Sequence, residues 1–127
     1  MKLLLDTSAL LWWLDKSTRL GERARSAISG PENIVFVSAA SAWDVAVKRA
    51  DGRLNAPGEI IDWLERNDFV ELPVSIAHAV ESAELPFHHR DPFDRLLIAQ
   101  SRLEGMALVT SDAKIAKYDV EILAADR

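Results

Sequence analysis

The sequence has 127 residues, the usual size of one domain, and 49% of them are apolar, which is enough for a core. Its apolar runs are far shorter than the roughly 20 residues that span a bilayer, and the absence of cysteine excludes disulfides and thiol chemistry. The net charge of −5 argues against binding nucleic acid by bulk electrostatics, but not against a site where bound cations offset negative charge. We therefore expect one cytoplasmic domain over residues 1–127, with no membrane segment.

In the first half of the chain, short apolar runs predict strands, and apolar residues three or four apart predict helices. In chain order, the expected elements are strand Leu3–Asp6, helix Ala9–Asp15, helix Gly21–Ser29, strand Ile34–Val37 and a helix from Ser38 through Ala50. Thr7 or Ser8 is expected to cap the first helix, because a hydroxyl can accept a hydrogen bond from a free backbone N–H.

The second half continues the alternation of helices and strands. The expected elements are helix Gly58–Arg66 started by Pro57, strand Phe69–Leu72, helix Ser75–Leu85, helix Asp91–Glu104, strand Ala107–Thr110 and strand Asp119–Leu123. Asp91 followed by Pro92 is typical of a helix start, with Asp as N-cap and Pro at the first helical position. The pattern predicts an α/β fold around a mainly parallel sheet of about five strands.

Four aspartates, Asp6, Asp44, Asp94 and Asp112, lie where a strand has just ended or a helix is beginning. If the strands that precede Asp6 and Asp112 are parallel, both carboxylates emerge at the carboxyl edge of the sheet, where open α/β sheets place ligands. Crowded carboxylates repel one another unless a cation lies between them, and hard oxygen ligands suit Mg²⁺ or Mn²⁺. The pattern predicts a divalent-metal site for phosphate chemistry.

Each aspartate also has a structural interpretation. Asp6 and Asp112 can cap helices or turns, Asp94 is favoured by the dipole of a helix N-terminus, and Asp44 can pair with Lys48 four residues later. Any one of them, taken alone, is better explained by structure than by catalysis. The four together favour a site.

The aromatic and histidine residues are more simply explained by structure. The tryptophans have helical spacing among apolar residues, which favours a core or subunit interface over base stacking: Trp12, Trp13, Trp43 and Trp63. His88 and His89 fall in a polar loop before Asp91, where a solvated side chain is the simpler expectation and a substrate or metal role the alternative.

Four segments together resemble the PIN-domain family, in order and with the right spacing. They are Leu3–Leu11, Ser38–Lys48, His89–Gln100 and Leu108–Asp112. The run Asp91-Pro92-Phe93-Asp94-Arg95 and the apolar residues after it are the most specific piece. Because the chain is a bare domain of this length, it is most similar to VapC-type toxins of prokaryotic toxin–antitoxin pairs.

The resemblance implies a three-layer α/β/α sandwich and a Mg²⁺- or Mn²⁺-dependent ribonuclease. It also implies a homodimer, and a cognate VapB-like antitoxin as the partner that holds it in check. By position, the catalytic and metal-binding residues would be Asp6, Asp44, Asp94 and Asp112. The expected supporting residues are Thr7, Ser8, Lys48, Asp91 as a cap, and Arg95, with Arg95 or Lys48 as a phosphate contact. Asp44 stands where the family usually has Glu and is one methylene shorter, so a metal contact through water or a weaker activity is expected.

Two other metal-dependent α/β classes fit poorly. A receiver domain needs adjacent acids after the first strand, and a haloacid-dehalogenase-type phosphatase needs Asp-x-Asp there, whereas this chain has Asp6-Thr7-Ser8. The remaining rival is a PIN-like module that has lost catalysis and acts through protein or RNA binding. Retention of all four acids counts against that alternative, and the Asp44 replacement counts slightly for it.

Overall fold

A computed structural model describes residues 1–127 and contains one five-stranded sheet with the order β3-β2-β1-β4-β5. Every neighbouring pair of strands is parallel. The strands are β1 (Lys2–Leu5), β2 (Ile34–Ser38), β3 (Val70–Leu72), β4 (Ala107–Thr110) and β5 (Ile122–Ala124). The helices are α1 (Thr7–Leu14), α2 (Glu22–Ser29), α3 (Ala39–Ala50), α4 (Ile60–Arg66), α5 (Ile76–Glu84) and α6 (Pro92–Glu104), with a short 3₁₀ helix at Ile115–Lys117.

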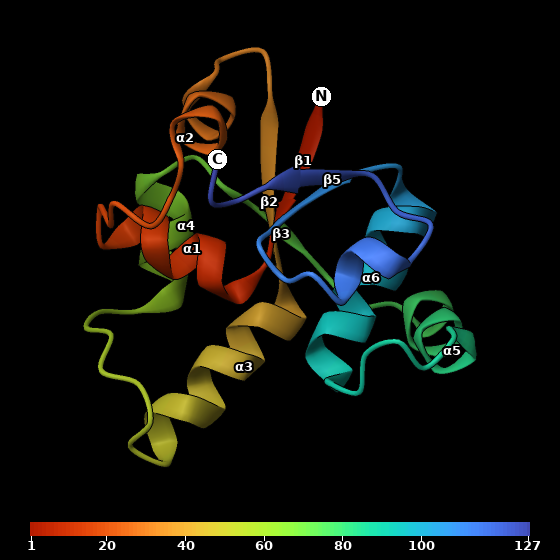
Figure 1. Ribbon diagram of the computed structural model, residues 1–127. Helices are drawn as coiled ribbons and strands as arrows, with labels where there is room; N and C mark the ends of the chain where they lie inside the picture. The colour runs from red at the N-terminus through yellow and green to blue at the C-terminus, as the bar shows by residue number, and fades with distance from the viewer.

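The central strand β1 divides the core in two, because successive side chains of a strand point to opposite faces. Leu3 and Leu5 join the apolar cluster under α1, α2 and α4, whereas Leu4 joins the cluster under α6. Figure 1 shows the strands between these two groups of helices, with α5 beside α6 on the second face. The predicted three-layer α/β/α sandwich is confirmed.

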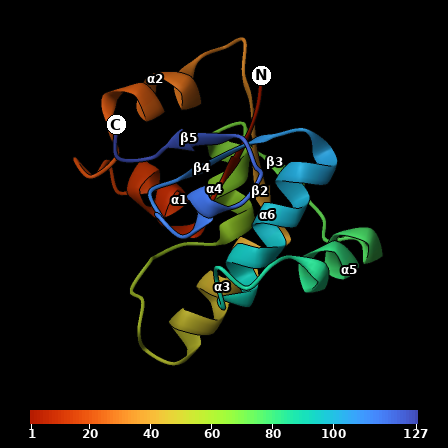
Figure 2. The ribbon, with the colours of Figure 1, turned by 45° about the vertical axis from the view of Figure 1, so that its right-hand side comes forward.

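The order of the strands determines where a ligand site can form. The chain leaves β1 toward β2 on one side and later returns to pair β4 on the other, so the connections change direction between β1 and β4. Loops at such a switch point, at the carboxyl ends of the strands, leave a crevice. Helix α3 extends beyond this edge, and the first turns of α6 run beside it (Figure 2).

The structure differs from the sequence prediction at the N-cap of α1 and at several element ends, among them the starts of α4 and β5. The first helix is capped by Asp6, not by Thr7 or Ser8, since the Asp6 carboxylate accepts from the Ala9 N–H at 2.8 Å. Helix α4 begins at Ile60, because Gly58 has a φ of +89°, a left-handed conformation that interrupts a helix. The last strand begins later than predicted, at Ile122.

Three of the four tryptophans are core residues, and for Trp43 the other predicted alternative, a subunit interface, stays a prediction. Trp63 is buried, and Trp12 and Trp13 pack against the cluster under α1. Trp43 is 62% exposed and lies edge-on to Phe93, so it is not a core residue. No helix of the structure combines the length and apolar character needed to cross a membrane.

Candidate metal centre

Asp6 directly follows β1, the central strand of the sheet. Its carboxylate is 6% exposed and caps α1. Burial raises the pKa of Asp6; hydrogen bonds from Thr110 and Ala9 act in the opposite direction, and the negative charges of Asp112 and Asp44 raise it further. Asp6 is therefore both a structural cap and a buried acid within electrostatic range of two other aspartates.

Asp44 projects from α3 toward the start of α1. It is 6% exposed, and its Oδ2 accepts a hydrogen bond from the Thr7 hydroxyl at 2.9 Å. Its Oδ1 pairs with Lys48 Nζ at 3.2 Å, one helical turn away. The predicted pair of Asp44 and Lys48 is present, but Asp44 is buried, which an ordinary surface partner of a lysine would not be.

Asp94 lies in the first turn of α6, and Asp91 caps that helix as predicted. Asp91 accepts from the Phe93 N–H at 2.9 Å, and Pro92 occupies the first helical position. Burial, followed by repulsion from Asp91, raises the pKa of Asp94 to about 7, although attraction to His89 opposes the shift. Smaller contributions in the same upward direction come from Asp6 and Asp112.

Asp112 follows β4 and faces Asp94 across His89. His89 Nε2 lies 2.7 Å from Asp112 Oδ2 and 3.1 Å from Asp94 Oδ2. Burial acts to raise the pKa of Asp112, but hydrogen bonds from His89 and from the Lys114 N–H outweigh it and lower the pKa below its ordinary value. The two carboxylates thus ionise differently although they share one neighbour.

His89 is the site residue whose importance the sequence underestimated. The expected solvated loop side chain is in fact 8% exposed, and one ligand atom each from His89, Asp94 and Asp112 lie within 4.8 Å of one another. The only sequence signal is its position five residues before Asp94, at the start of the PIN-like segment His89–Gln100.

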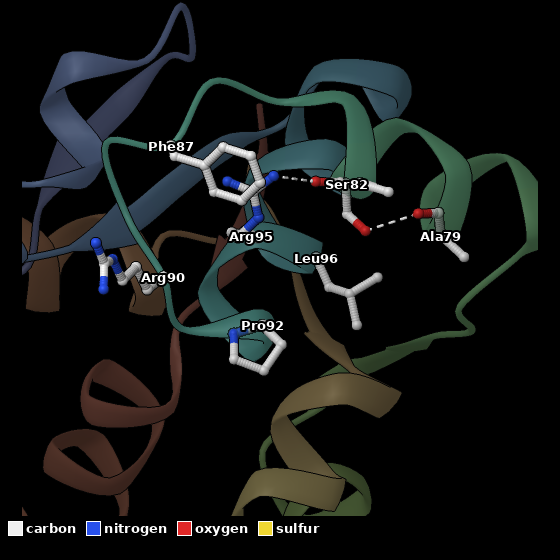
Figure 3. Close-up of a pocket in the computed structure, with 8 residues that line it drawn as sticks. Ala79, Ser82, Phe87, Arg90, Pro92, Arg95 and Leu96 are labelled. Atoms are coloured by element: carbon white, nitrogen blue, oxygen red, sulfur yellow. Dashed lines mark hydrogen bonds between the residues drawn. The ribbon is translucent and has the colours of Figure 1, made fainter.

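Arg95 does not have the predicted role of a phosphate contact. It is buried, and its two terminal nitrogens donate to four backbone carbonyls, those of Ser82, Leu85, Pro86 and His89. Figure 3 shows Arg95 beneath the exposed Phe87 ring in a pocket between α5 and α6, with its guanidinium directed at Ser82. This pocket contains none of the four aspartates, so Arg95 is a structural clamp.

The structure thus brings Asp6, Asp94 and Asp112 into mutual electrostatic range and places Asp44 next to Asp6 through Thr7. Ser8 is exposed on α1, and no side-chain hydrogen bond of Ser8 is present. Carboxylate oxygens that repel one another at a sheet edge are the donor set that a hard divalent cation requires. The residues present therefore fit Mg²⁺ or Mn²⁺.

Comparisons with known proteins agree with this architecture. A family model described as PIN domain matches residues 3–121. Among solved structures, VapBC2 from Rickettsia felis bound to a promoter DNA fragment is 12% identical with a TM-score of 0.68, over 97% of this chain and 98% of that chain. A toxin–antitoxin complex from Klebsiella pneumoniae is 20% identical with a TM-score of 0.65, over 97% of each chain.

A third similar structure is FitAB bound to the DNA fragment IR36, which is 19% identical with a TM-score of 0.58 over 98% of this chain and 96% of that chain. At these identities the likeness establishes the fold and no more. The search of curated proteins gives no match.

Proposed function

The chain belongs to the PIN-domain family, and from this membership we propose that it is a metal-dependent endoribonuclease acting as the VapC-type toxin of a toxin–antitoxin pair. The observation that carries the proposal is the gathering of four separately encoded aspartates at the switch point of the sheet. Burying mutually repelling carboxylates costs stability, and a fold retains such a cluster most readily when a cation binds it.

Asp6, Asp94 and Asp112 would hold the metal, with Asp44 assisting from the side of Asp6. A bound Mg²⁺ or Mn²⁺ would supply a water of lowered pKa and neutralise charge on the scissile phosphate. In the metal-free protein the pKa of Asp94 is raised to about 7, and a bound cation would favour its ionised, metal-binding form. Thr7 orients Asp44 by its 2.9 Å hydrogen bond.

Cations for the RNA backbone must come from elsewhere than Arg95. Lys48 is partly exposed and already near the site through Asp44, and Arg90 is exposed on the loop that carries His89. These two residues are the candidates for phosphate contacts.

The proposed partners are RNA, a VapB-like antitoxin and a second copy of the chain. One similar structure is a toxin–antitoxin complex from Klebsiella pneumoniae, and this supports an antitoxin partner for the present chain. The homodimer is supported by large apolar side chains that α3 and α5 leave exposed, namely Trp43, Val47, Ile76 and Val80.

A second candidate function is a PIN-like module that binds without cleaving. The observation in its favour is Asp44, which stands in place of the family's Glu and is already bonded to Thr7 and Lys48. The biological effect of such a binding module would survive the loss of Asp6, whereas the effect of an enzyme would not.

The proposal is tested by incubating the antitoxin-free protein with total RNA in Mg²⁺ or Mn²⁺, against EDTA, beside Asp6→Asn. Discrete products that need metal and disappear in the variant are the expected result, and sequencing their ends would identify the target. Because Asp6 also caps α1, a circular dichroism melt must show that the variant is folded. Absence of cleavage by the folded wild type in both metals would contradict the nuclease and favour the binding module.

A further inference from the structure

Every polar atom of His89 has a hydrogen-bonding partner, supplied by the start of α6, by Asp112 or by Tyr118. Its backbone N–H donates to the Tyr118 hydroxyl at 2.9 Å, and its carbonyl accepts from Arg95 Nη1 at 3.2 Å. In the ring, Nδ1 accepts the Asp91 N–H at 3.1 Å, while Nε2 faces Asp94 and Asp112. A residue fixed at all four positions is preorganised, which a space-filling loop side chain does not require.

The contact at Nδ1 determines which ring nitrogen carries the hydrogen. A backbone N–H can only donate, so Nδ1 must present its lone pair to Asp91. The hydrogen of the neutral ring then resides on Nε2, where it points at the two carboxylates. With its lone pair engaged at Nδ1 and its hydrogen at Nε2, the ring has no free lone pair to offer a metal ion.

The loop that carries His89 is anchored by buried polar groups from elsewhere in the fold. Tyr118 donates to the Pro86 carbonyl at 2.6 Å, and Arg95 reaches the same carbonyl at 3.0 Å. Arg95 also donates to carbonyls at the end of α5, so one guanidinium ties α5, the loop and α6 together (Figure 3). The ring of His89 is consequently held by a rigid support.

We propose that His89 is a positioning residue that orients the Asp94 and Asp112 carboxylates by a shared Nε2–H donor and is not itself a metal ligand. The inference rests on the proposed metal-dependent function of the same site. The distances of 2.7 and 3.1 Å let one N–H restrain one oxygen of each carboxylate. The second oxygen of Asp94 accepts no hydrogen bond, and that of Asp112 accepts the Lys114 N–H at 2.9 Å but keeps another lone pair for a cation. Such a partner tunes a metal centre without entering its coordination sphere.

The test compares Mn²⁺ binding by calorimetry and RNA cleavage in wild type, His89→Ala, His89→Gln and His88→Ala. Gln places an amide N–H at about the reach of imidazole Nε2. His88 is the matched control, because it is exposed and contacts only the Tyr118 ring among aromatic residues. We expect His89→Ala to weaken Mn²⁺ binding roughly 10- to 100-fold, Gln to restore most of it, and His88→Ala to match wild type.

A second measurement needs neither metal nor RNA. Long-range ¹⁵N–¹H correlation spectra of the metal-free protein at mildly alkaline pH should show His89 with hydrogen on Nε2 and none on Nδ1. The opposite tautomer would overturn the proposal, as would unchanged Mn²⁺ binding in a folded His89→Ala. A loss of binding as large as that caused by Asp94→Asn would also overturn it, since that would identify a ligand. Wild type that binds Mn²⁺ but cleaves no RNA would contradict the proposed function and leave the role of His89 to be decided by the binding data.

Discussion

The two halves of the acidic site balance their negative charge in different ways. On the side of α1 and α3, Asp44 already has a cation and a hydroxyl donor, Lys48 and Thr7, at 3.2 and 2.9 Å. On the side of α6 and β4, Asp94 and Asp112 share a single imidazole nitrogen. In this second half, the pKa of Asp94 is raised to about 7.

This difference indicates on which side of the site a bound divalent ion would lower the electrostatic free energy most. An ion beside Asp44 would have to displace or share Lys48, whereas an ion between Asp94 and Asp112 would relieve repulsion that the neutral imidazole leaves in place. The acids of one site are therefore unequal, although all four were recognised by the same kind of sequence pattern.

The largest effect should be on the rate of RNA cleavage when the negative charge of Asp94 is removed. We expect Asp94→Asn to lower the rate of RNA cleavage by roughly 10²- to 10³-fold, about 3–4 kcal/mol of transition-state stabilisation. Asp44→Asn should lower it less, because Asp44 is already engaged with Lys48 and Thr7. Single-turnover cleavage in Mn²⁺ measures both, and an equal loss in the two variants would remove the distinction between the halves.

The next largest effect should be on folding stability, through Arg95 and Tyr118, which anchor the loop that carries His89. Arg95→Met leaves buried carbonyls of α5 and the His89 loop without their donor, and should lower the free energy of unfolding by about 2–3 kcal/mol. Tyr118→Phe, which removes one hydroxyl that bonds His89 and Pro86, should cost about 1 kcal/mol. Urea denaturation measures both; a negligible change in Arg95→Met would contradict the clamp.

The pH dependence of stability offers a further test of the second half. The pKa of Asp94 is raised from its ordinary value of 3.8 to about 7 in the folded protein, so the folded state binds this proton more tightly than the unfolded state. The stabilising contribution of Asp94 is complete below pH 3.8 and is lost as the pH rises to about 7. In EDTA, the free energy of unfolding should fall over this range in wild type and fall less in Asp94→Asn; equal slopes would contradict the assignment.

The smallest effect on stability should come from removing the charge of Lys48, in the first half of the site. Lys48 has a side chain that is 38% exposed, so solvent screens its pair with Asp44. We expect Lys48→Met to lower the free energy of unfolding by no more than about 1 kcal/mol, because the hydroxyl of Thr7 still bonds Asp44. Thermal denaturation provides the measurement, and a loss as large as that of Arg95→Met would show that the first half depends on its cation.

Local sequence patterns were sufficient for the framework of the site. The apolar runs before Asp6 and Asp112 predicted two buried strands, and parallel pairing on either side of β1 put both acids at one edge. Asp91-Pro92 predicted the start of α6 and with it the position of Asp94. These inferences succeeded because each depends on side chains within a few positions of one another.

The remaining features depend on contacts between distant residues. His89 is buried because Tyr118, 29 positions away, accepts its backbone N–H, and no local pattern reports that contact. Arg95 turns inward because the end of α5 leaves carbonyls unsatisfied, so its charge is used in folding and not on RNA. The predicted start of α4 at Gly58 is wrong for a local reason. Pro57-Gly58 fits a helix start as well as a turn, and in the structure Gly58 has a left-handed φ of +89°, so the helix begins later.

The inequality of the two halves is tested most directly by locating Mn²⁺ through its anomalous scattering in crystals of the protein. We predict a peak within coordination distance of Asp94 and Asp112 carboxylate oxygens, with Lys48 still paired to Asp44. A peak whose nearest carboxylate is Asp44, with Lys48 displaced, would contradict the account.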